Sequence, residues 1–88
     1  MNNEALIELI RIVEQAKSDP AVTKLGANYI AVDSYGIIRA FVKEPYINKK
    51  EGNIWDTTSN KHILLGIVKC SDLRLNWKNT IRSLIPTI

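Results

Sequence analysis

The alternation of apolar and polar positions between residues 28 and 43, NYIAVDSYGIIRAFVK, predicts a β-hairpin. Its turn is Asp33-Ser34-Tyr35-Gly36, in which Asp at the first position and Gly at the fourth are typical of a type I turn. Gly36 can adopt the left-handed conformation of a bulge without steric cost, and this bulge sets the register. We therefore expect Tyr29 opposite Phe41, Ile30 opposite Ala40, Ala31 opposite Arg39 and Val32 opposite Ile38.

This register gives the hairpin two different faces, because directly opposed residues lie on the same face of a sheet. The first face is apolar throughout and is expected to be core; it carries Ile30, Val32, Ile38, Ala40 and Val42. The second face mixes rings, aliphatic side chains and cations; it carries Tyr29, Ala31, Ile37, Arg39, Phe41 and Lys43. A functional surface is therefore expected on the second face.

A helical period flanks the hairpin on both sides. Residues 3–18 place their apolar side chains on a broad arc, which predicts an amphipathic helix that lies on the sheet or also touches a second subunit. Pro20 ends this helix, and Gly26 ends a short helical turn after it. Near the other end, Trp77, Ile81, Leu84 and Ile85 recur at helical spacing, which predicts a helix over about 76–85 with Asn76 as its N-cap.

Residues 61–70, KHILLGIVKC, predict a further strand, and its nearly continuous hydrophobicity favours a central place in the sheet. The polar residues 46–60 before it predict a loose hairpin or a loop. Together the elements indicate one domain over residues 1–88, of the α+β class. We expect an antiparallel meander of three to four strands with an N-terminal and a C-terminal helix packed on one face.

Composition narrows the choice of function. The chain has 88 residues, of which 45% are hydrophobic and 24% charged, as is ordinary for a small globular domain. No apolar run approaches the roughly 20 residues that cross a bilayer, and the first residues are acidic where a signal peptide is basic, so a cytoplasmic location is expected. The net charge of +3 permits contact with an anion but does not require one.

Candidate chemistry is sparse. Cys70 is the single cysteine and His62 the single histidine, so we expect no disulfide, no metal site, no cofactor and no catalytic triad. Cys70 is interpreted as a small buried hydrophobe and His62 as a surface or edge histidine. Asp33 and Ser34 are explained by turn chemistry, so an enzyme is not expected.

Candidate binding residues lie on the second face and in the polar segment that follows it. Rings beside cations are typical of surfaces that stack bases and hold phosphate, but Tyr29 and Phe41 could equally form a cross-strand pair covered by another segment or a partner. Trp55 is either a lid on the open face or an anchor for a ligand or partner. The candidate set is Tyr29, Arg39, Phe41, Lys43, Tyr46, Lys49, Lys50 and Trp55.

One pattern in the chain resembles a known group of proteins. It consists of Tyr29 to Asp33, Gly36, Pro45, Trp55, Gly66 to Val68, Trp77 and Ser83-Leu84. It is similar to small uncharacterised α+β proteins encoded by phages and prophages, in which a YxAVDxxG strand precedes a proline, a tryptophan, a glycine-containing strand and a terminal Trp-to-Ser-Leu helix. The resemblance covers roughly residues 28–85 and leaves out the first helix and Lys49-Lys50.

The resemblance implies a small accessory protein that acts by binding. We expect an inhibitor of a bacterial defence system such as CRISPR, which blocks an effector protein or sequesters a nucleotide signal in the host cytoplasm and forms a homo-oligomer. Two alternatives stay open: a small nucleic-acid-binding module that uses the same residues, and a structural protein without a ligand. The basic charge argues against a DNA mimic.

Overall fold

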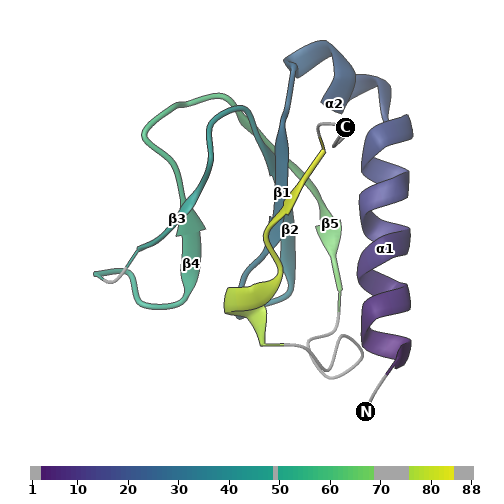
Figure 1. Ribbon diagram of the computed structural model, residues 1–88. Coiled ribbons are helices and arrows are strands. Elements are labelled where there is room, and N and C mark those ends of the chain that lie inside the picture. The colour runs from purple at the N-terminus through teal and green to yellow at the C-terminus, as the bar shows by residue number, and fades with distance from the viewer. Residues whose placement is uncertain (1–2, 49, 69–75, 85–88) are drawn as a thin grey trace.

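A four-stranded antiparallel sheet lies at the centre of the fold, with the first helix on one side of it and a two-stranded sheet on the other (Figure 1). The computed structural model describes residues 3–48, 50–68 and 76–84. The α+β class predicted from the sequence is confirmed. The strand order of the main sheet is β5-β2-β1-β6, and β3 pairs with β4 in the smaller sheet.

The elements follow one another along the chain in the order in which Figure 1 labels them. They are α1 (Asn3–Ser18), α2 (Pro20–Leu25), β1 (Tyr29–Val32), β2 (Ile37–Phe41), β3 (Tyr46–Asn48), β4 (Ile54–Asp56), β5 (His62–Ile67), a 3₁₀ turn η1 (Trp77–Asn79) and β6 (Arg82–Ser83).

The β1–β2 hairpin has the predicted register, with Tyr29 opposite Phe41 and Val32 opposite Ile38. Its turn is held by Asp33, whose Oδ1 accepts hydrogen bonds from the amides of Tyr35 at 2.9 Å and Ile37 at 3.1 Å. Gly36 has φ = 83°, which is the left-handed conformation expected of the bulge. The local turn chemistry thus fixes which side chains share each face.

The predicted end of α1 and start of α2 are confirmed. The Asp19 carboxylate accepts a hydrogen bond from the Ala21 amide at 2.9 Å, and Pro20 occupies the first turn, where its missing N–H costs nothing. Gly26 ends α2 in the left-handed conformation with φ = 77°, and its amide donates to the carbonyls of Val22 and Thr23. This tight connection returns the chain to the sheet at β1.

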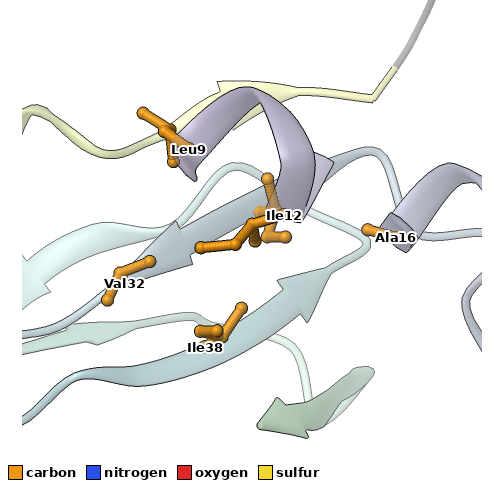
Figure 2. Close-up of a cluster of buried hydrophobic side chains, with 6 residues drawn as sticks. Leu9, Ile12, Ala16, Val32 and Ile38 are labelled. Carbon is orange, nitrogen blue, oxygen red and sulfur yellow. The ribbon is translucent and has the colours of Figure 1, made fainter. Parts of the chain in front are cut away.

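The first face of the sheet is buried against α1. Leu9, Ile12 and Ala16 of the helix pack on Val32 and Ile38 of the hairpin, as Figure 2 shows. The helical residues recur at the spacing that places them on one side of α1. This cluster is the core that the alternation in the hairpin predicted.

The second face of the sheet is also buried, but only in part. Trp55 of β4 covers Ala31 and Phe41, and all three side chains are at most 5% exposed. Half-buried apolar side chains pack around this group: Tyr29, Ile47, Trp77 and Ile81. The β3–β4 hairpin therefore forms a third layer, and the expectation that Trp55 is a lid on the open face is confirmed.

Two expectations about the secondary structure are wrong: the place of β5 in the sheet and the C-terminal helix. β5 lies at an edge of the main sheet rather than at its centre, because residues 46–60 fold over the sheet as the β3–β4 hairpin instead of adding a strand beside β5. The helix predicted over 76–85 is replaced, within its described residues, by η1 and β6. Ser83 pairs there with Tyr29, so the end of the described chain completes the other edge of the sheet.

Thr80 supplies the physical reason for the missing helix. Its buried side-chain oxygen accepts a hydrogen bond from the Val32 amide at 2.9 Å and lies 2.8 Å from the Val32 carbonyl oxygen and 2.7 Å from that of Trp77. The hydroxyl thus satisfies the main chain of β1 beyond the end of β6. A tertiary contact of this kind outweighs the weak helical preference of a short segment.

Several predicted features fall outside the described residues. They are Cys70 with the end of the strand predicted over 61–70, Lys49 in the β3–β4 turn, and Ile85 at the end of the helix predicted over 76–85. None of the described helices is long and apolar enough to span a bilayer.

Candidate functional site

The aromatic surface predicted on the second face is not available as a whole. Phe41 is fully buried, and Trp55 is 5% exposed. The Trp55 indole lies on this face with its Nε1 3.1 Å from the carbonyl oxygen of Val32 and 3.3 Å from that of Trp77. Of the two alternatives left open by the sequence, the structure therefore matches a Tyr29–Phe41 pair covered by another segment, and the buried Phe41 and Trp55 rings do not form an exposed binding surface.

Tyr29 and Arg39 lie with Phe41 and Trp55, whereas Lys43, Tyr46 and Lys50 lie outside this group. Tyr29 and Arg39 are half-buried, and Lys43 is exposed just beyond β2. Tyr46 is 47% exposed on β3, and Lys50 is exposed in the β3–β4 turn. The fold therefore brings four of the predicted residues together, but the rings of Phe41 and Trp55 among them are buried.

The uncovered half of the second face lies over β5. Leu64 is opposite Arg39, and Ile67 is opposite Ile37, so both side chains share the face of Phe41. They are 63% and 75% exposed, whereas the apolar residues beneath Trp55 are buried. We call Leu64 and Ile67 the β5 strip.

Beside the β5 strip, the Phe41 ring lies next to the side chains of Arg39 and His62. The Arg39 guanidinium lies over the Phe41 ring, 5.4 Å from its centroid, and donates a hydrogen bond to the Trp55 carbonyl. The His62 ring is opposite Phe41 on β5, with the two centroids 5.9 Å apart. Arg39 thus links the main sheet to the hairpin that covers it.

Asp56 is the carboxylate of this region. The pKa of its carboxyl is below the ordinary value, chiefly because the Asn48 side chain donates a hydrogen bond to it at 2.8 Å. The Thr57 amide donates a second at 2.8 Å, and the positive charges of Arg39 and His62 act in the same direction, against the opposing effect of burial. The lowered pKa favours the ionised form of Asp56, and the hydrogen bond from Asn48 links β4 to β3.

The exposed side chains of this surface are mostly aliphatic. Within residues 3–48, 50–68 and 76–84, no three or more His, Cys, Asp or Glu side chains come together as metal ligands. What the surface offers is two exposed aliphatic side chains, with the Arg39 guanidinium opposite Leu64. Such an arrangement suits a protein partner, because interfaces combine an apolar centre with a polar rim.

Sequence reasoning missed the β5 strip. The signal is the nearly continuous hydrophobicity of residues 62–68, but this pattern predicts a central strand. The same pattern on an edge strand leaves apolar side chains in solvent. Only knowledge of where residues 46–60 fold would have separated these two outcomes.

Comparisons with known proteins give no functional assignment for this surface. The chain matches no protein-family profile, no curated protein and no solved structure.

Proposed function

We propose that this protein acts by binding another protein through the β5 strip, as a small phage-type inhibitor of a bacterial defence system. The observation that carries the proposal is the exposure of Leu64 and Ile67 on a face whose other half is buried. Large apolar side chains grouped on one uncovered face mark interaction sites more often than single exposed ones. The defence role extends the resemblance to phage-encoded proteins.

Within that role, an effector protein is a better target than a nucleotide signal. Nucleotide recognition uses exposed rings on which a base can stack, and two of the four candidate rings, Phe41 and Trp55, are buried. Leu64 and Ile67 offer aliphatic contact instead, which suits the apolar centre of a protein interface. The same burial weakens the alternative of a nucleic-acid-binding module.

The proposal can be tested in bacterial strains that each carry one defence system and are infected with a phage sensitive to it. The protein is expected to restore plaque formation in at least one strain. The double variant Leu64→Asp/Ile67→Asp should lose this activity, because the charges disrupt an apolar contact while the exposed positions leave folding intact. Ile10→Asp is the matched control, since Ile10 is 59% exposed but lies on α1.

Two results would count against the proposal. Failure of the wild-type chain to restore plaques in every strain removes the role as an inhibitor of those systems. Equal restoration by the wild type and by the Leu64→Asp/Ile67→Asp variant removes the β5 strip as the binding site. Circular dichroism of both variants checks that each is folded.

A further inference from the structure

A cavity of about 310 Å³ lies between α1 and β6, which run side by side (Figure 1). Leu9, Ile10 and Val13 line it from the helix. Arg82 lines it from β6, where it is opposite Ile30 of the core, so its side chain is on the first face of the sheet, beside α1. The cavity is therefore on the other face of the sheet from the β5 strip.

The helix side of this cavity combines a hollow with a protruding apolar side chain. Leu9 is buried and Val13 is half-buried, whereas Ile10 is exposed at the same cavity. A surface that carries both features can fill its own cavity in a second copy of the chain. Such self-complementarity is what a two-fold symmetric interface requires, because the same patch serves on both subunits.

The walls of the cavity carry opposite charges, which come from Glu14 on α1 and Arg82 on β6. Glu14 pairs with Lys17 at 3.5 Å, but both side chains are largely exposed, and a surface pair of this kind contributes little. Arg82 donates through Nη1 to the carbonyl oxygens of Asn79 and Ile81, each at 2.7 Å. Among the described residues no carboxylate pairs with Arg82, so its positive charge is not neutralised.

The two charges point toward opposite ends of the cavity. A second cavity, lined by Lys17 and Leu84 among others, shows that α1 and β6 run in the same direction. Glu14 is about one helical turn beyond Ile10 toward that end. The Arg82 guanidinium turns back instead, toward the carbonyls that precede it on the chain.

This arrangement of charges selects among the possible occupants. A small anion in the cavity would be repelled by Glu14, and a small cation by Arg82. A second copy turned by a two-fold axis near Ile10 carries the same charges in the reverse order. Its Glu14 then faces Arg82 of the first copy, and its Arg82 faces the first copy's Glu14.

We infer that the cavity between α1 and β6 is the interface of a homodimer, in which two antiparallel α1 helices place Ile10 of each copy at the other's cavity. Two reciprocal Glu14–Arg82 ion pairs flank this apolar contact. The interface is on the first face of the sheet, so it leaves the β5 strip of each copy open. The inference therefore goes beyond the proposed function and does not rest on it.

Sedimentation velocity over a series of protein concentrations tests the dimer. Ile10→Asp should raise the dimer dissociation constant at least about tenfold, because it places a charge in the apolar centre of the interface. Leu64→Asp/Ile67→Asp is the control and should leave the constant unchanged. A wild-type chain that stays monomeric up to millimolar concentration overturns the inference. A dimer that is lost in Leu64→Asp/Ile67→Asp but kept in Ile10→Asp also overturns it, because the β5 strip is then the interface.

Mixing two charge-reversed variants tests the reciprocal ion pairs. Glu14→Arg and Arg82→Glu should each dimerise more weakly than the wild type, because each homodimer opposes like charges twice. Mixed together, they should form a heterodimer in which both pairs have opposite charges again. Arg11→Glu is the control partner for Glu14→Arg: Arg11 is exposed on α1 but does not line the cavity, so this mixture should not recover.

The outcome of the mixing experiment does not depend on an assumption about folding. Recovery in the mixture of Glu14→Arg and Arg82→Glu shows that both variants are folded and supports the interface. Circular dichroism identifies a variant that is unfolded, and the effect of Ile10→Asp, an exposed position, then decides alone. Two folded variants that do not recover on mixing overturn the reciprocal contact. Equal recovery with Arg11→Glu overturns it as well.

Discussion

The indole nitrogen of Trp55 lies 3.1 Å from the main-chain oxygen of Val32, and this hydrogen bond joins the β3–β4 hairpin to the centre of the main sheet. The ring that makes the bond also covers Phe41 and Ala31. A single side chain thus supplies both the apolar cover and the polar link between two layers. It also decides which half of the second face stays open to a partner.

Removal of the Trp55 ring should destabilise the protein strongly. Trp55→Ala is expected to lower the free energy of unfolding by about 3–5 kcal/mol, because it leaves a cavity over Phe41. Trp55→Phe keeps most of the burial and loses the indole donor, so a loss of about 1 kcal/mol is expected. Urea denaturation measures both. Tyr46→Ala, at an exposed ring of the same hairpin, should change stability by no more than about 0.5 kcal/mol.

Loss of the Thr80 hydroxyl should leave a main-chain amide of β1 without its hydrogen-bond acceptor. Thr80→Val keeps the shape of the side chain but leaves the buried Val32 amide without its acceptor, which is expected to cost about 1–3 kcal/mol. Thr80→Ser keeps the hydroxyl and should cost less. Hydrogen exchange at the Val32 amide should speed up in Thr80→Val. Unchanged exchange would contradict the assigned contact.

The elements that the sequence predicts well are those whose cause is local. The β1–β2 register follows from Asp33 and Gly36, which lie within the turn itself, and the join between α1 and α2 follows from Asp19, Pro20 and Gly26. Each of these residues acts on its own main chain or on neighbours a few positions away. Their effects are therefore visible in a short window of sequence.

The elements that the sequence predicts badly depend on distant partners. The segment around Thr80 has helical spacing, but it pairs with Val32 and Tyr29, far away along the chain. The exposure of the candidate binding residues is predicted worst, because it depends on where Trp55 packs. Tyr29, Phe41 and Arg39 were correctly placed on one face, yet their burial could not be read from that face alone.

Substitutions at two glycines should separate a conformational requirement from an incidental one. Gly36→Ala is expected to cost about 1–2 kcal/mol, because φ = 83° is unfavourable for a residue with a Cβ. Gly66→Ala should be neutral or stabilise by up to about 1 kcal/mol, since a Cβ there meets no atom within 4 Å and φ is not positive. Thermal or urea unfolding distinguishes the two. Equal losses would argue against the assigned turn.

Low pH should lower the free energy of unfolding, because Asp56 becomes protonated. Because the pKa of this carboxyl is lower in the folded state than its ordinary value of about 3.9, its contribution to stability is present above that value. The contribution is lost as the pH falls below about 4 and through the folded pKa. Asp56→Asn should flatten this part of the stability curve. Asn48→Ala, which removes the main donor, should raise the pKa of Asp56, and NMR titration of the carboxyl measures that shift.

The pairing of Tyr29 with Ser83 has a consequence for the order of folding. The β1–β2 hairpin closes a turn of a few residues, so it can form early, whereas β1 and β6 must meet across most of the chain and bear the entropy of a long loop. We expect the sheet to grow outward from the hairpin and to gain β6 last. Pulse-labelled hydrogen exchange should then protect the Asp33 amide, which bonds to Ile37, before that of Leu84, which bonds to Asn28. During synthesis, the edge of β1 that pairs with β6 would stay unpaired until β6 leaves the ribosome.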